Sequence, residues 1–158
     1  MRGKRVTPRK IKPDLRYQDE KVAKFINYLM CQGKKNAARR IFYDTLDYIG
    51  KNSGEDALKI FFKAIDNVGP KVELRSRRIG GGNYQIPFPT DERRRFTLAS
   101  RWIIEAARDR KGKPMREKLA EEILAASKEQ GSAITKRDNV YKMAEANRAF
   151  AHLARRAS

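Results

Sequence analysis

The stretch KVELRSRRIGGGNYQIPFPTDERRRFTLASR, residues 71–101, contains a predicted β-hairpin. Strand-forming residues fill 72–78 and 83–88, on either side of three glycines at 80–82. Glycine adopts positive φ at no steric cost, so the glycine triplet predicts the tip of the hairpin. An isolated two-stranded ribbon is only marginally stable, so the hairpin needs a supporting body and a partner along its length.

Arginines dominate this predicted ribbon. Side chains alternate between the two faces of a strand, so Glu73, Arg75 and Arg77 are expected on one face and Arg78 on the other. Three more arginines, at 93–95, follow the second strand. Guanidinium groups bind phosphates bidentately and stack on bases, so the pattern predicts a polyanionic partner.

The composition favours the same kind of partner. The 158 residues include 37 Lys and Arg against 19 Asp and Glu, a formal net charge of +18, and such a surplus is typical of nucleic-acid-binding proteins. Apolar residues make up 40% of the chain, which favours one folded domain over 1–158. No run approaches the ~20 apolar residues of a membrane span, and no secretory signal is recognised. The basic start is not Ser-rich as a transit peptide would be, so we expect a cytoplasmic protein without a membrane partner.

Helical periodicity surrounds the hairpin. Residues 1–16 hold seven basic residues without an apolar period and are predicted to form an irregular arm, and 153–158 a short basic tail. The predicted helices run over 19–31, over 36–49, from Ser53 to before Pro70, over 92–110, from Pro114 to near Gly131, and from Thr135 through Phe150. The fold class is therefore mainly α, a six-helix bundle with a protruding two-stranded β-hairpin arm between helices three and four.

Local signals set the expected helix ends. Gly33 is expected to end the first helix, and Gly50 and Gly54 mark the exit of the second. Ser53 with Asp56 and Thr135 with Asp138 have the spacing of capping boxes. The expected buried faces are Val22, Phe25, Ile26, Leu29 and Met30; Ala38, Ile41, Phe42, Leu46 and Ile49; Leu58, Phe61, Phe62 and Ile65; Phe96, Ala99, Trp102, Ile103 and Ala106; Met115, Leu119, Ile123 and Leu124; and Val140, Met143, Ala144 and Phe150.

Enzyme signatures are absent. The GGGN segment lacks the Gly-Lys-Ser/Thr of a phosphate-binding loop, and one His with one Cys cannot supply a zinc site. His152 has no evident nucleophile or orienting partner. The acid pairs Asp91-Glu92 and Glu121-Glu122 are expected at a helix start and on an exposed face, and Cys31 is expected buried or half-buried. We therefore predict no catalytic residue, no metal and no cofactor.

Basic residues also gather outside the hairpin. Arg94, Arg101 and Arg108 recur every seven residues and form one helical stripe. Lys34 and Lys35 follow Gly33 in a turn, where the backbone can approach a phosphate. A further basic cluster comprises Arg148, His152, Arg155 and Arg156.

Two alternatives remain open from the residues. Tyr84 either stacks on an unpaired base or packs as an ordinary cross-strand partner. An architectural DNA-binding protein also uses a helical body with ribbon arms, but it wedges an apolar residue or proline near the tip. Here the tip is all glycine and Pro87 and Pro89 lie near the foot, which disfavours DNA bending.

Four segments resemble the small-subunit ribosomal protein seven family in its bacterial form. They are VAKFINYLMCQGKKNAARRIFY (22–43), ELRSRRIGGGNYQIP (73–87), RRFTLASRWIIEAAR (94–108) and KRDNVYKMAEANRAFAH (136–152). The resemblance implies a primary rRNA-binding protein that binds the 3′ major domain of 16S-class rRNA and nucleates assembly of the subunit head. It also implies a ribbon near the mRNA exit path and E-site tRNA, neighbouring ribosomal proteins as partners, and a monomer within the ribosome.

The resemblance also implies particular RNA contacts. These are Arg2, Lys4, Arg5, Arg9, Lys10, Lys34, Lys35, Arg75, Arg77, Arg78, Arg94, Arg95, Lys136 and Arg137. The distribution of charge and aromatic residues adds Tyr84, Arg101 and Arg148. The chain departs from the family pattern after His152, where LARRAS follows, and at Tyr141, where the family usually has His. The RNA and protein contacts that the family makes through its C-terminus are therefore not assigned to this chain. Translational autoregulation, in which the protein binds a fold of its own mRNA that mimics the rRNA site, is compatible with rRNA binding.

Overall fold

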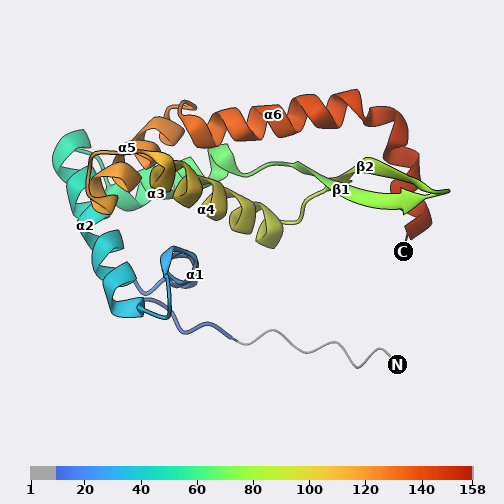
Figure 1. Ribbon diagram of the computed structural model, residues 1–158. Coiled ribbons are helices and arrows are strands. Elements are labelled where there is room, and N and C mark those ends of the chain that lie inside the picture. Colours follow the sequence, from blue (N-terminus) through green and yellow to red (C-terminus); the bar gives the residue numbers. More distant parts are fainter. Residues whose placement is uncertain (1–9, 158) are drawn as a thin grey trace. The chain divides into compact units, whose positions relative to one another are not determined.

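The computed structural model describes residues 10–157 of the chain, with side chains described through His152. Within that range the fold is mainly α-helical, as predicted, with a two-stranded antiparallel sheet between the third and fourth helices (Figure 1). The elements are α1 (Glu20–Leu29), α2 (Lys35–Ser53), α3 (Ala57–Val68), β1 (Val72–Ile79), β2 (Gly82–Pro89), α4 (Glu92–Asp109), α5 (Met115–Ser127), α6 (Ser132–Ala146) and the 3-10 helix η1 (Arg148–Ala157). The chain divides into two compact units, Met1–Arg40 and Ile41–Ser158.

In the first unit, α1 follows from its cap and its apolar spacing. The Asp19 carboxylate accepts hydrogen bonds from the backbone N–H groups of Lys21 and Val22, at 2.6 and 3.0 Å, which satisfies donors that a helix start leaves unpaired. Its buried residues are Val22, Ala23, Phe25, Ile26 and Leu29. The helix ends at Leu29, and the following Met30 is extended and half-buried, so the prediction that Gly33 ends the helix was wrong.

The exit from α2 agrees with the prediction at Gly54 and differs from it at Gly50. The helix continues through Gly50 to Ser53, and the turn falls on Gly54 with φ of 68°. The Ser53 hydroxyl donates to the Ile49 carbonyl oxygen at 2.7 Å, and Asp56 caps α3 in its place. The predicted Ser53–Asp56 capping box was therefore wrong, because Ser53 is the last residue of α2 and lies three residues before the N-cap of α3.

In the second unit, α3, α4, α5 and α6 pack against one another around an apolar core. The prediction for α4 is confirmed, since Phe96, Ala99, Trp102, Ile103 and Ala106 are all buried. The Phe42 and Phe61 rings meet edge to face, with centroids 5.2 Å apart. Some expected core residues are only half-buried: Ile41, Leu58, Phe62, Met115, Leu124, Val140, Ala144 and Phe150.

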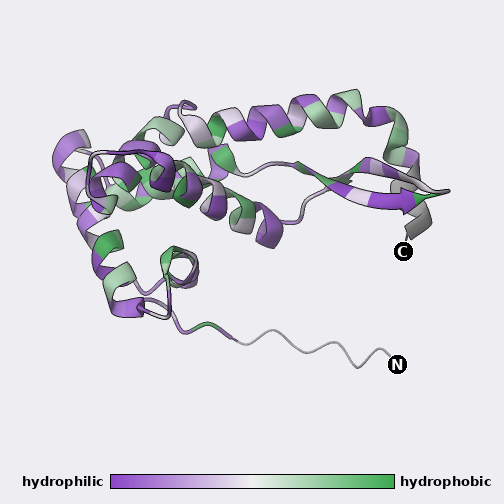
Figure 2. Cartoon of the chain, viewed as in Figure 1, coloured by the Kyte–Doolittle hydropathy of each residue, from purple (hydrophilic) through white to green (hydrophobic). Residues whose placement is uncertain are grey.

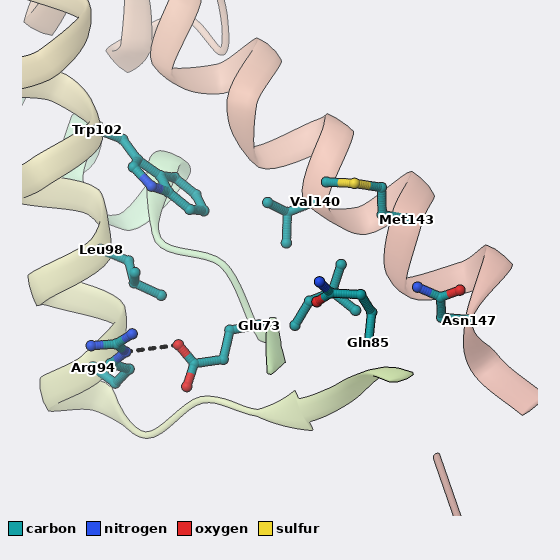
Figure 3. A pocket seen from close by; sticks show the side chains of 9 residues that line it. Glu73, Gln85, Arg94, Leu98, Trp102, Val140, Met143 and Asn147 are labelled. Carbon is teal, nitrogen blue, oxygen red and sulfur yellow. Dashed lines mark hydrogen bonds and ion pairs between the residues drawn. The ribbon is translucent and has the colours of Figure 1, made fainter. Parts of the chain in front are cut away.

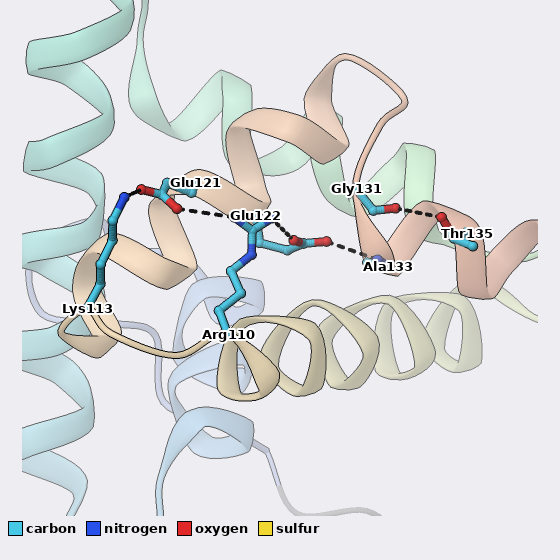
Figure 4. Close-up of polar contacts among 7 residues, drawn as sticks. All are labelled: Arg110, Lys113, Glu121, Glu122, Gly131, Ala133 and Thr135. Carbon is cyan, nitrogen blue, oxygen red and sulfur yellow. Dashed lines mark hydrogen bonds and ion pairs between the residues drawn. The ribbon is translucent and has the colours of Figure 1, made fainter.

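Glu122 corrects the prediction for α5. We expected this acid on an exposed face, but it is 0% exposed. Its carboxylate accepts from the Ala133 N–H at 2.9 Å and pairs with Arg110, which also contacts Glu121 at 3.1 Å (Figure 4). Glu122 thereby joins the end of α4 to the start of α6, whose N-cap Gly131 has no side chain to cap it. A buried carboxylate is tolerated here because its charge and its lone pairs are both satisfied.

The start of α6 also differs from the prediction. The helix begins at Ser132, and the Thr135 hydroxyl donates to the Gly131 carbonyl oxygen at 3.1 Å, so the Thr135–Asp138 capping box was wrong. Much of α6 is hydrophilic (Figure 2), and Met143, expected in the core, is 49% exposed. The helix ends at Ala146, before Phe150. Since α6 packs on both α4 and β1, it is divided between the helical core and the ribbon.

The ribbon has the predicted form. The strands pair antiparallel from Val72 opposite Pro89 to Ile79 opposite Gly82, leaving a two-residue loop. Gly80 and Gly81 have φ of 56° and 89°, the left-handed values that the twist of a tight hairpin requires. The supporting body predicted for the ribbon is provided by α6, which packs on β1, and by η1, which packs on β2.

Candidate nucleic-acid interface

The arginines of the ribbon lie along β1. Arg75 and Arg78 are exposed, and Arg77 is half-buried. The guanidinium carbons of Arg75 and Arg77 lie 5.0 and 5.4 Å from the centre of the Phe88 ring, within cation–π range. Phe88 pairs with Glu73 in the register, and directly opposite residues share a face. The ring therefore orders two arginines on the face where the alternation predicted them.

Glu73 joins the ribbon to α4. It is 6% exposed, and its two carboxylate oxygens accept from Arg75 Nε at 2.6 Å and Arg94 Nε at 2.7 Å. Burial by itself would raise the pKa of Glu73, but hydrogen bonds and positive charge from Arg94 and Arg75 outweigh it and lower this pKa below its ordinary value. Glu73 thus remains ionised at neutral pH. Both arginine side chains remain about half exposed, at 52% for Arg75 and 43% for Arg94.

Along α4 some arginine side chains are exposed to solvent, and another turns back toward the protein. The Asp91 carboxylate accepts from the Arg94 N–H at 2.7 Å, as expected for an acid at a helix start. Arg94 and Arg101 are both exposed on the predicted stripe. Arg95 instead turns toward the end of α3, with Nη2 3.5 Å from the Gly69 carbonyl oxygen. Its buried Nε has no hydrogen-bond partner among the described residues.

Lys136 and Arg137 have partners within the protein. Lys136 Nζ lies 2.7 Å from a Glu105 carboxylate oxygen, which ties α6 to α4. Arg137 Nη1 donates to the Asn67 carbonyl oxygen at 2.6 Å, and the side chain is only 18% exposed. Arg137 also pairs with Asp138. Arg137 is therefore held between α6 and α3, whereas Lys136 remains 44% exposed beside its surface ion pair.

Tyr84 and Arg148 meet the C-terminal segment. The Tyr84 ring lies 5.1 Å from the Phe150 ring of η1, a partner that neither interpretation of the sequence anticipated. Tyr84 is also opposite Arg77 in the strand register, and 36% of the residue remains exposed. Arg148 is exposed and lies 3.4 Å from Glu145, one helical turn earlier.

The remaining predicted contacts lie in the first unit. Lys10 is exposed, and so are Lys34, which follows the turn where Gly33 has φ of 72°, and Lys35, the first residue of α2. Cys31, in the same turn, is exposed, so its expected burial was wrong because α1 ends before reaching it. Arg2, Lys4, Arg5 and Arg9 lie outside the described residues.

A pocket of about 350 Å³ lies between the ribbon, α4 and α6. Figure 3 shows its apolar side, where Leu98 and Trp102 of α4 face Val140 and Met143 of α6. Polar groups complete it: Gln85, Asn147 and the Glu73–Arg94 pair. Nothing in the linear sequence indicated this pocket, because three elements distant along the chain meet to form it.

The described part of the chain shows neither of two other kinds of site. Residues 10–157 bring no three His, Cys, Asp or Glu side chains together in a group that could hold a metal ion. No helix in that range has the length and apolar character needed to cross a membrane.

Fold, charge and side-chain arrangement define a class of protein: a basic, mainly helical protein whose arginines extend from a β-ribbon onto the adjoining helix. Comparison with known proteins identifies the family. The family model described as ribosomal protein S7p/S5e matches residues 1–148. The chain belongs to this family of ribosomal proteins, which are structural constituents of the small ribosomal subunit rather than enzymes.

Curated relatives match the chain over nearly its full length. The small ribosomal subunit protein uS7 of Pseudothermotoga lettingae is 53% identical over 153 residues, covering 97% of this chain and 99% of that protein. The uS7 proteins of Fervidobacterium nodosum and Magnetococcus marinus are each 51% identical. They cover 96% of this chain, and 98% and 97% of their own lengths. The resemblance found in the four sequence segments is confirmed.

Proposed function

We propose that this chain is a primary rRNA-binding protein that binds a multi-helix junction in the 3′ major domain of 16S-class rRNA. By holding that junction, it nucleates assembly of the head of the subunit. The ribbon lies near the mRNA exit path and E-site tRNA, and neighbouring ribosomal proteins complete its surroundings. The protein acts in the cytoplasm, as a monomer within the ribosome.

The Glu73 cluster is the observation that carries this proposal. Its buried carboxylate holds Arg75 of the ribbon and Arg94 of α4, while both guanidinium groups remain accessible. Arg78 and Arg101 are exposed on the same two elements. Pre-ordered, exposed guanidinium groups suit phosphate oxygens, because their positions are set before binding. Contacts of this kind fix orientation on RNA, while the shape of the junction provides selection.

The first prediction tests the ribbon. Replacing Arg75, Arg77 and Arg78 together with Ala should flatten the dependence of log affinity on log salt by about 0.7–0.9 for each phosphate that these arginines neutralise. The affinity for a three-way rRNA junction is measured by filter binding between low and moderate salt. Helical circular dichroism should not change, since the three side chains are not in the helical core. An unchanged slope would remove the ribbon from the RNA interface.

One observation keeps an architectural DNA-binding function as the second candidate. Ile79 is 37% exposed beside the tip, where such proteins place an apolar wedge. Competition between duplex DNA and the RNA junction separates the two functions. RNA should compete at much lower concentration, and Ile79→Ser should leave its binding unchanged. Preferential binding to duplex DNA, abolished in Ile79→Ser, would favour the second candidate.

A further inference from the structure

The pocket between the ribbon, α4 and α6 has two chemically different parts. Leu98 and Trp102 on one side, with Val140 and Met143 opposite, form an apolar slot (Figure 3). Its volume of about 350 Å³ is within the range of small-ligand sites. Met143 is 49% exposed, so the slot opens to solvent on the α6 side.

Two amide side chains provide the polar part. Gln85 Nε2 donates to Ser76 Oγ at 2.8 Å, which leaves the amide oxygen as an acceptor. The Asn147 side chain makes no hydrogen bond to any other described side chain, so its donor and acceptor are both available there. Amides on the wall of an apolar slot favour an occupant with flat apolar faces and a polar edge.

Charge at the pocket restricts the occupant further. Arg94 lines the pocket and is held by Glu73 with its guanidinium 43% exposed. A cation next to an aromatic slot suits a group whose apolar ring is attached to an anionic backbone. An aliphatic side chain of another protein would fill the slot but leave the Gln85 amide oxygen and the Asn147 amide without a partner, which is unfavourable.

We infer that this pocket binds one unpaired nucleobase of the RNA. The inference rests on the proposed function and adds to it. The base enters the slot and contacts the part of Trp102 that the fold leaves exposed, 9% of the residue. Its polar edge meets Gln85 and Asn147, and its phosphate lies toward Arg94. Unpaired bases stacked on aromatic side chains and read at their edges are the usual basis of sequence-specific RNA recognition. The pocket thus adds base recognition to contacts that otherwise read only phosphates.

The single tryptophan of the chain makes binding observable. The full-length protein is titrated with hexaribonucleotides of A, C, G or U, and Trp102 fluorescence is recorded together with affinity. We expect at least one hexamer to quench the fluorescence at saturation. Val140→Phe, which fills the slot, should weaken binding of that hexamer about tenfold, the usual scale for removal of one base stack.

Two controls separate the pocket from other effects. Asn139→Phe adds the same ring at an exposed position one residue away on α6 and should behave as wild type. Gln85→Ala with Asn147→Ala keeps the slot and should reduce the difference in affinity among the four hexamers. This second test holds even if Val140→Phe unfolds the protein, a possibility that circular dichroism reveals.

The outcomes distinguish the inference from the proposed function. Equal binding by all variants, without quenching, would overturn the nucleobase site while leaving RNA binding intact. Absence of binding to both the hexamers and the rRNA junction would overturn the proposed function and the inference together. If Val140→Phe binds the hexamers normally but fails to enter small subunits, a protein side chain is the occupant and the nucleobase site is overturned.

Discussion

The two ends of α4 carry arginines that meet buried glutamates, and the two pairs serve different purposes. At the start, Arg94 pairs with Glu73 of the ribbon, and at the end Arg110 pairs with Glu122 of α5. Glu122 is 0% exposed, and its carboxylate also accepts a hydrogen bond from the buried Ala133 N–H at the start of α6. This carboxylate joins three helices.

Glu73 differs from Glu122 because both of its partners are arginines with half-exposed side chains. Both of its oxygens are occupied, yet Arg75 and Arg94 remain about half accessible to a ligand. The same acid–guanidinium chemistry thus stabilises the fold at one end of α4 and prepares a binding surface at the other. The two arginines of α4 differ little in exposure, 33% for Arg110 and 43% for Arg94. What distinguishes the pairs is the additional partner of the acid, which is a backbone N–H of the interior for Glu122 and a second half-exposed arginine for Glu73.

The largest expected effect is at the Glu122 end. Glu122→Ala leaves the buried Ala133 N–H without its acceptor and Arg110 with Glu121 alone, and a buried donor left unsatisfied costs about 1–3 kcal/mol of unfolding free energy. Urea unfolding measures the decrease. The matched control is Glu121→Gln, a partly exposed neighbour paired with Lys113, which should cost about 0–1 kcal/mol. Equal decreases in the two variants would contradict the structural role of burial at Glu122.

A smaller effect of unexpected sign is predicted at the Glu73 end. Removing an acid from a basic surface should, on charge alone, strengthen RNA binding. Glu73→Gln should instead weaken it, by up to about tenfold, because two guanidinium side chains lose the group that orders them before binding. Affinity for the rRNA junction at fixed salt is the measurement.

The control for this prediction is Glu145→Gln. Glu145 is an exposed acid 3.4 Å from the exposed Arg148, so its replacement removes the same charge without disturbing a buried cluster. The RNA affinity of this variant should stay the same or rise slightly. If Glu73→Gln also raised affinity, Glu73 would be only a repulsive charge, and the contrast between the two ends of α4 would disappear.

The smallest effect is a pH dependence of stability. Because the folded pKa of Glu73 lies below its ordinary value of 4.5, its contribution is present above that pH and is lost as pH falls through the lowered folded pKa. The stability difference between wild type and Glu73→Gln should therefore be present at pH 7 and close at lower pH. Urea unfolding across that range checks this. A difference independent of pH would contradict an ionised Glu73 cluster.

Much of the fold could be predicted from local patterns. Apolar spacing identified α1 and α4 with their buried residues, and the glycine triplet identified the ribbon, because each depends on neighbours a few residues apart. Several of the errors arose at helix ends, and others, such as the burial of Glu122, within helices. Ser53 and Thr135 had the spacing of capping residues, but each hydroxyl donates to a carbonyl four residues earlier. Side chains of this type bond in either direction, and local sequence does not decide which.

The candidate site was less predictable. Arg75, Arg94 and Arg101 are as accessible as their spacing suggested, whereas Arg137 and Arg95 turn toward α3. In the sequence these arginines look alike. A cation becomes internal only when a carbonyl or carboxylate from a distant segment lies within reach, as the Asn67 carbonyl oxygen does for Arg137.

Charge, helical periodicity and family membership follow from the order of the residues alone, since they depend on composition, on short-range spacing and on similarity. Tertiary packing decided that Glu122 is buried, that Glu73 orders two exposed arginines, and that a pocket opens beside Trp102. The physical reason is distance along the chain. The groups that neutralise, bury or face these side chains come from other helices and strands, and only the folded arrangement brings them within hydrogen-bonding range.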